Sequence, residues 1–331
     1  LHGRGLYREP LIEGLLKREP AGAIIVSIGG NAIIRRADSV TIEEQFENVR
    51  AACSYIARMV KGGGAVIITH GNGPIVGNIV IRNEAVRDRI PPMPLYMCDA
   101  DSEGGIGFMI QQTLHNEIYK AHKIQDVVTV VTQVVVDGSD PAFKTPVKPI
   151  GPYYTEEEAE RLAGMGWSMV RDPVKGYRRV VASPRPKRIV EAEAIRKICE
   201  AGIIVIAAGG GGVPVVETED GTLKGVDAVI DKDLATALLA RETGAGLIIN
   251  LTQVDKVYLN YGKPGQTGLS ELTVSQARRY LNEGQFPPGS MGPKIDAAIE
   301  FLEGGGKEVI ITEPELIEDA LVGAAGTRIV P

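Results

Sequence analysis

The sequence predicts an α/β fold built around an open, mostly parallel sheet. Apolar runs recur at 23–28, 65–69, 127–136, 203–208, 247–251 and 309–312. These runs are continuous rather than alternating, as expected for strands that are buried on both faces. Helical patterns lie between them at 42–61, 109–122, 189–200 and 234–242. Strands that alternate with helices in this way favour a parallel sheet covered by helices.

Two features refine this organisation. The helix over 42–61 has the best-marked start, because Thr41 suits the N-cap and Glu44 stands in the capping-box position. The stretch 137–186 interrupts the alternation, since it is rich in proline and scattered charge and contains Trp167, the only tryptophan. An insertion of this length in a compact domain is usually functional or a small subdomain.

Composition excludes several classes of protein. The 331 residues are 44% hydrophobic and carry a net charge of -6 with no sustained basic cluster, so we expect no nucleic-acid binding. The longest apolar run, 201–216, is short for a membrane span and rich in glycine. The three cysteines are far apart and predict a reducing, cytoplasmic setting, and the four histidines are too dispersed for a metal cluster. Residues 1–20 are predicted to be an N-terminal extension of unknown role, ahead of a domain over 21–331.

Four turns at predicted strand ends are candidates for ligand binding. They are Gly29-Gly30-Asn31, the segment 69–78 with Gly71-Asn72-Gly73, the segment 207–214, and the segment 251–258. Ligands of open α/β sheets bind outside the carboxyl ends of the strands. Glycines there expose backbone N–H groups, and a following helix adds its positive end. The turns therefore predict a phosphate-bearing ligand.

The common phosphate-binding motifs are absent. Both Gly-Lys pairs, at 262–263 and 306–307, lack the Ser or Thr of a Walker A motif. The glycine that follows Gly71-Asn72-Gly73 is Gly77, one residue too late for a dinucleotide fingerprint. His70 fits a packed or orienting residue better than a catalytic base.

Three lysines stand in rigid contexts rather than on charged helix faces. Lys148 lies in "FKTPVKPIGP", Lys232 in "VIDKDLA" between two aspartates, and Lys294 in "GSMGPKI". Lysines held by proline and aspartate are good candidates for anchoring phosphate oxygens, because the ammonium group is a compact point charge.

These motifs together resemble those of the carbamate kinases, a branch of the amino acid kinase family. The resemblance runs from about Ala21 to Thr327 and rests on "SIGGNA", "THGNGPIVGN", "KPIGP", "GVDAVIDKDLA" and "EGQFPPGSMGPK". It implies the reaction of ATP with carbamate to give ADP and carbamoyl phosphate, linked to arginine catabolism or to carbamoyl phosphate supply. It also implies a three-layer fold with about eight strands, a protruding subdomain at 137–186 and a homodimer. The carbamate-binding half would span 21–200 and the nucleotide-binding half 201–331.

The resemblance assigns roles to individual residues. Lys148, Lys232 and Lys294 would neutralise charge during phosphoryl transfer, and Asp233 would orient them. The transferring phosphoryl group would be held by Gly29, Gly30 and Asn31, and carbamate by Gly71, Asn72 and Gly73. The nucleotide would contact Gly209, Gly210, Gly211, Gly212, Asp255, Tyr258, Lys263 and Met291. Mg²⁺ would bind mainly to the ATP phosphates, with no protein ligand assigned.

One segment departs from the family pattern, which leaves details of oligomerisation and regulation open, and two alternatives to a carbamate kinase remain besides. Tyr96, Asp101 and Glu103 differ from the residues usual in carbamate kinases, in a segment expected near the dimer face. One alternative is a kinase for another carboxylate such as acetylglutamate, against which "KPIGP" argues. The other is a non-catalytic nucleotide sensor, against which the three lysines argue. The sequence leaves the physiological direction and any regulation undetermined.

Overall fold

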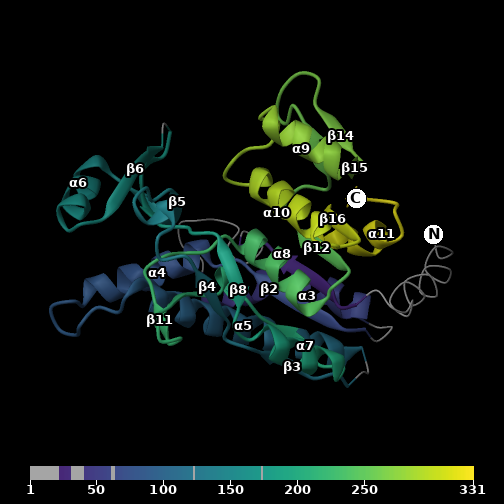
Figure 1. The fold of residues 1–331 in the computed structure, drawn as a ribbon, viewed down its shortest axis with the longest axis horizontal. Helices are drawn as coiled ribbons and strands as arrows, with labels where there is room; N and C mark the ends of the chain where they lie inside the picture. The colour runs from purple at the N-terminus through teal and green to yellow at the C-terminus, as the bar shows by residue number, and fades with distance from the viewer. Residues whose placement is uncertain (1–21, 31–40, 61–63, 122–123, 173) are drawn as a thin grey trace.

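A computed structural model describes residues 22–30, 41–60, 64–121, 124–172 and 174–331. The predicted extension 1–20 and Asn31 lie outside these described residues. The fold is the predicted three-layer α/β arrangement, shown as a ribbon in Figure 1.

An eight-stranded, mainly parallel sheet forms the centre, which confirms the predicted fold class. In spatial order its strands are β15 (Glu271–Thr273), β17 (Thr327–Val330), β16 (Glu308–Thr312), β12 (Leu247–Leu251), β1 (Ile24–Ile28), β2 (Val66–His70), β9 (Ile204–Ile206) and β3 (Val127–Thr129). Among the strand pairs of this sheet, only β16–β17 is antiparallel. Strand β9 falls in the predicted nucleotide-binding half, yet it lies between β2 and β3.

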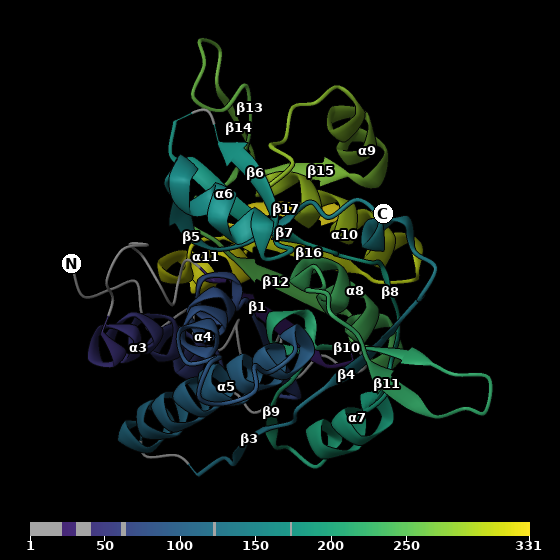
Figure 2. The same ribbon diagram turned by 90° about the vertical axis from the view of Figure 1, so that its left-hand side faces the viewer.

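Helices cover both faces of this sheet (Figure 2). They are α3 (Ile42–Met59), α4 (Gly73–Ala85), α5 (Leu95–Lys120), α7 (Ala192–Glu200), α8 (Lys232–Thr243), α9 (Val274–Asn282), α10 (Met291–Glu303) and α11 (Ile317–Leu321), whereas α6 (Glu156–Gly164) belongs to the insertion. Neighbouring strand residues point to opposite cores: Ile25 packs with side chains of α7, α8 and α10, and Val26 with those of α3, α5 and α11. Burial on both faces explains the continuous apolar runs.

A smaller sheet and a hairpin complete the main body. The smaller sheet contains β11 (Leu223–Gly225), β10 (Val213–Glu217), β4 (Gln133–Val136) and β8 (Pro186–Ile189), and the hairpin β13 (Val257–Leu259) and β14 (Thr267–Leu269). The apolar run 127–136 is therefore two strands in different sheets.

The proline-rich insertion contains a small separate unit. Three antiparallel strands, β5 (Lys148–Tyr154), β7 (Gly176–Val181) and β6 (Ser168–Asp172), pack with helix α6. Figure 1 shows this subdomain standing away from the main sheet on one side. Trp167 contacts Tyr154 edge-on and Arg179 through its ring face, so it helps to join the strands of this unit.

Two helix predictions need correction. The helix expected over 109–122 begins at Leu95, fourteen residues earlier than expected, because glycine and acidic residues in its first half mask the helical pattern. The helix expected from residue 189 begins at Ala192, since Pro186–Ile189 forms a strand. By contrast, Thr41 and Glu44 form the predicted capping box of α3.

Candidate active site

A cavity of about 1040 Å³ lies at the carboxyl ends of β1, β2 and β12. Its lining brings together all three lysines singled out in the sequence, Lys148, Lys232 and Lys294. The glycine turns 29–30 and 71–73 also form its walls. Residues that are separated by more than 260 positions in the chain thus meet at one edge of the sheet.

Asp233 is the centre of a buried lysine cluster. Its Oδ1 accepts a hydrogen bond from Lys232 Nζ at 3.0 Å, and Lys294 Nζ lies 3.1 Å from Oδ1 and 3.0 Å from Oδ2. Lys232 Nζ also donates to Ser27 Oγ at 2.6 Å. Helix α8 begins at Lys232, so its first turn presents both Lys232 and Asp233 to the cavity.

The charged groups in this cluster change one another's pKa values. Burial opposes ionisation of Asp233, but the ammonium groups of Lys232 and Lys294 outweigh burial and hold the Asp233 pKa well below its usual range. Burial lowers the pKa of Lys232 to about 8, with Lys294 adding to the decrease and Asp233 opposing it. One buried carboxylate therefore keeps two ammonium groups together.

Lys148 connects the subdomain to the same helix start. Lys148 begins β5, and its Nζ lies 2.6 Å from Asp231 Oδ2. Asp231 is the N-cap of α8, since its Oδ1 accepts from the backbone N–H of Asp233 at 2.9 Å. This ion pair holds the first residue of β5, where the subdomain begins, against the cavity wall.

The two glycine turns approach each other closely. Gly71 N–H donates to Ile28 O at 3.0 Å, and a Cβ on Gly71 would lie 2.8 Å from the Gly30 nitrogen. A Cβ on Gly30 would meet nothing closer than 3.8 Å. Packing within the protein thus requires glycine at 71, whereas at 30 it leaves open space at the edge of the cavity.

Helix α4 directs its N-terminus at the cavity. Its N-cap, Asn72, makes no side-chain capping bond, and Gly73 and Pro74 at the helix start line the cavity. The first-turn N–H groups and the helix dipole make such an end suitable for an anion. The predicted carbamate cradle at 71–73 therefore has a physical basis for binding a carboxylate or a phosphate.

Glu103, one of the departures from the family pattern, lies directly behind the site. It is 1% exposed, and its Oε1 accepts from Gly209 N–H at 2.9 Å while Oε2 accepts from Thr132 N–H at 3.1 Å. Burial raises the pKa of Glu103 to about 8, although both backbone hydrogen bonds lower it. The side chain anchors the turn that starts at Gly209, which is a buried structural role rather than a surface one.

That turn lies against the carbamate side of the predicted site. A Cβ on Gly210 would lie 2.2 Å from Asn72 Nδ2, and Gly210 lines the cavity. Gly209, Gly211 and Gly212 are buried and do not line it. Gly210, Gly211 and Gly212 have φ values of 68°, 104° and 81°, which explains why glycine is needed there.

His70 ends β2 directly beneath this turn and is fully buried. Its Nε2 has no hydrogen-bond partner, and its Nδ1 lies 3.3 Å from Gly71 O. Burial lowers its pKa to about 4, so the ring is neutral near pH 7. A packed, neutral imidazole agrees with the orienting role that the sequence favoured over catalysis.

The remaining predicted nucleotide residues do not line this cavity. Asp255, Tyr258, Lys263 and Met291 are absent from its walls, and Tyr258 Oη instead donates to Asp255 Oδ1 at 2.7 Å. From the predicted turn 251–258, Leu251, Thr252 and Gln253 do line it. The sequence analysis missed other polar residues of the lining, namely Arg178, Ser183, Asp231, Ser290, Glu313 and Glu315. It also missed Ser27, a polar residue inside an apolar strand, which was a usable signal.

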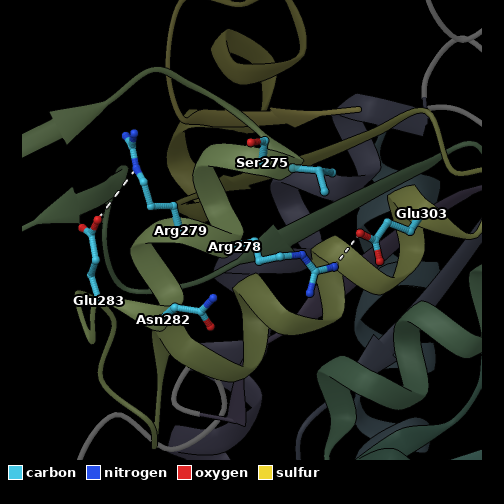
Figure 3. A pocket seen from close by; sticks show the side chains of 7 residues that line it. Ser275, Arg278, Arg279, Asn282, Glu283 and Glu303 are labelled. Atoms are coloured by element: carbon cyan, nitrogen blue, oxygen red, sulfur yellow. Dashed lines mark hydrogen bonds and ion pairs between the residues drawn. The ribbon is translucent and has the colours of Figure 1, made fainter.

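A second hollow of about 640 Å³ lies on α9 and α10, away from these residues (Figure 3). Its charged side chains pair with one another: Arg278 Nη2 lies 2.5 Å from Glu303 Oε1, and Arg279 Nε lies 3.8 Å from Glu283 Oε1. None of its lining residues also lines the larger cavity. The lysines and glycine turns make the larger cavity the candidate active site.

The described ranges contain neither a candidate metal cluster nor a membrane-spanning helix. No three His, Cys, Asp or Glu side chains there are grouped so that they could hold a metal ion. No helix in the described part of the chain has the length and apolar character needed to cross a membrane.

Comparisons with known proteins identify the family of this chain. The amino acid kinase family matches residues 22–313. The chain is 50% identical to the carbamate kinase-like protein YahI of Escherichia coli, over 93% of this chain and 98% of that protein. It is 48% identical to carbamate kinase of Pyrococcus horikoshii, over 93% of this chain and 99% of that protein. The chain belongs to the amino acid kinase family.

Solved structures place the same fold in this family. Carbamate kinase from Giardia lamblia bound to AMP-PNP superposes with a TM-score of 0.86 at 41% identity, covering 94% of this chain and 98% of that one. The eight-stranded sheet of this amino acid kinase therefore matches a family member that was solved with an ATP analogue.

Proposed function

We propose that this protein is a carbamate kinase, a phosphotransferase with a carboxyl group as acceptor. The observation that carries the proposal is the convergence of Lys148, Lys232 and Lys294 on one cavity walled by glycine turns. Relatives named carbamate kinase at 48% identity over nearly the whole chain support this acceptor rather than acetylglutamate. Retention of all three lysines argues against a non-catalytic sensor.

The chemistry follows from charge and position. An oxygen of the carbamate carboxylate attacks the terminal phosphorus of ATP, the bond to the bridging oxygen breaks, and ADP leaves with that oxygen's electron pair. No protein nucleophile is needed, because the acceptor is itself an anion. Lys232 and Lys294, both held by Asp233, would neutralise charge on the transferring oxygens, and the open space beside Gly30 would admit a phosphoryl group.

The nucleotide site and its metal belong to this proposal too. ATP or ADP would bind across β12 toward Thr252 and Gln253, which line the cavity. Mg²⁺ would be carried mainly by the nucleotide phosphates, since it keeps several waters and few protein ligands. Lys148 and Lys232 would face those phosphates, and each is paired with a carboxylate, Lys148 with Asp231 and Lys232 with Asp233. We also propose a homodimer and a cytoplasmic location.

A comparison of acceptors tests the proposal. ADP production from ATP is measured with carbamate, formed from ammonium and bicarbonate, and separately with acetylglutamate and aspartate. Of the three acceptors, we expect only carbamate to support ADP production. We expect the Lys294→Ala variant to lose this activity. Lys224→Ala is the matched control, because Lys224 is exposed on β11 and does not line the cavity. Turnover with acetylglutamate in place of carbamate would overturn the proposal.

A further inference from the structure

Asn72 connects the cavity wall to a buried polar face of α5. Its Nδ2 donates to Ser102 Oγ at 2.8 Å and to Asp99 Oδ1 at 3.2 Å. Asn72, Ser102 and Asp99 are 4%, 1% and 2% exposed. Asn72 lines the cavity between Gly71 and Gly73, so α5 supports the residue from behind.

The hydroxyl group of Ser102 determines which way the Asn72 amide faces. Its single hydrogen is donated to the backbone oxygen of Asp99 at 2.8 Å. A serine hydroxyl has one donor, so toward Asn72 the Ser102 oxygen can only accept. If the amide were reversed, Asn72 Oδ1 would face the lone pairs of Ser102, whose hydrogen is already donated to Asp99 O. Both hydrogens of Nδ2 therefore point to α5, and Oδ1 points away from the helix.

Because Nδ2 is bonded to α5, Oδ1 is the polar atom of the side chain that Asn72 can offer to a ligand in the cavity it lines. Lysines and glycine N–H groups suit the oxygens of a carboxylate or a phosphate, and an amide oxygen would repel them. The carboxylates of Asp231 and Asp233 are already engaged by lysines at 2.6 Å and 3.0 Å. An amide oxygen fixed at this position instead matches a substrate N–H, and carbamate has an amino group beside its carboxylate.

We propose that Ser102 and Asp99 are positioning residues that fix Asn72 Oδ1 as the acceptor for the amino group of the substrate. The site would thereby select a carbamoyl group over an acetyl group of nearly equal shape. This inference rests on the proposed function. Acetyl phosphate is the natural probe, because it has a methyl group where carbamoyl phosphate has the amino group.

The test measures selectivity in the direction of ATP formation from ADP. It compares the KM of carbamoyl phosphate with the competitive inhibition constant of acetyl phosphate. In Ser102→Ala, we expect the preference for carbamoyl phosphate to fall about 2- to 10-fold, the value of one hydrogen bond. Asp99→Ala removes the other Asn72 acceptor and should shift the preference in the same direction.

The chain offers a closely matched control. Ser54 on α3 donates to Ala51 O at 2.8 Å, the same bond to the third preceding carbonyl that Ser102 makes, but unlike Ser102 it is not hydrogen-bonded to Asn72. Ser54→Ala should therefore leave the preference unchanged. Circular dichroism and ADP binding by calorimetry check that each variant is folded.

A double-mutant cycle separates positioning from a general loss of structure. Asn72→Ala should lower the preference by itself, and adding Ser102→Ala should lower it no further, because Ser102 acts through Asn72. An unchanged preference in both Ser102→Ala and Asp99→Ala, or losses that add in the double variant, would overturn the inference. A parent protein that makes no ATP from carbamoyl phosphate would instead overturn the proposed function.

Discussion

Replacing Asp233 with asparagine should destabilise the protein more than replacing either of its lysine partners. Both Nζ atoms lie within 3.1 Å of Asp233 Oδ1, so the two ammonium groups of Lys232 and Lys294 are at most about 6 Å apart. At an effective dielectric constant of about 20, their repulsion is about 3 kcal/mol once the carboxylate is gone. Removing one partner of a buried ion pair generally costs about 3–5 kcal/mol, in agreement.

Urea unfolding followed by far-UV circular dichroism at pH 7 gives the free energy of unfolding. We expect Asp233→Asn to lose about 3 kcal/mol, and the double variant Asp233→Asn/Lys294→Met to recover most of it, because only one ammonium group remains. A loss below about 1 kcal/mol in the single variant would refute the reasoning, since it would mean that the cluster is not held by this carboxylate.

The pH dependence of this loss provides an internal check. The Lys232 pKa is already lowered to about 8 from its ordinary 10.5, so the folded parent binds fewer protons than the unfolded chain between these values and gains stability as the pH rises. Without the Asp233 charge, the Lys232 pKa falls further and this gain begins at lower pH. The difference in stability between parent and Asp233→Asn should therefore narrow as the pH rises to about 8, and stay nearly constant above it, where Lys232 is neutral in both folded proteins.

Three more predictions concern catalysis and buried charge. Alanine at Lys232 or Lys294 should lower kcat about 10²–10³-fold while changing ADP affinity far less, and near-normal turnover in both variants would contradict the assignment. The Glu103 pKa is raised to about 8 from 4.5, so the parent should lose stability relative to Glu103→Gln as the pH rises through that window, by at most about 1.4 kcal/mol per pH unit; a difference independent of pH would contradict it. Lys148 and Val181 are paired across β5 and β7, so an Asn-Gly turn can join them in place of the subdomain. This variant keeps Lys148 but removes Pro149, Ile150 and Arg178 from the cavity wall, so we expect it to bind ADP and to lose turnover; an active protein would show the subdomain to be dispensable.

The sheet could be predicted from the sequence because its strands are buried on both faces. Short continuous apolar runs such as 23–28 and 247–251 are typical of strands buried on both faces, and both runs are strands in the structure. The capping box at Thr41 predicted the start of a helix. Strands β15 and β17 were not predicted, since they are short and only part of their residues are buried; β15 is the edge strand of the sheet and β17 is its neighbour.

The candidate site was predictable where local sequence is unusual, and not where the fold alone brings residues together. Lys232 and Lys294 stood out by their rigid contexts, and the structure places both on Asp233. The first half of α5 gave no helical signal, because its buried face is polar: Asp99, Ser102 and Glu103 occupy positions i, i+3 and i+4 of one helix face. Apolar periodicity cannot detect such a face.

ATP formation from ADP and carbamoyl phosphate tests the central claim most directly, because it requires the lysine cluster, the glycine turns and the nucleotide site to act together. The protein is mixed with ADP, Mg²⁺ and carbamoyl phosphate, and ATP is detected by luciferase, with Lys294→Ala as the negative control and Lys224→Ala as the positive one. The proposed function predicts rapid ATP formation in the parent and in Lys224→Ala, and a rate lower by about 10²–10³-fold in Lys294→Ala. A folded parent that binds ADP but forms no ATP from carbamoyl phosphate would contradict it.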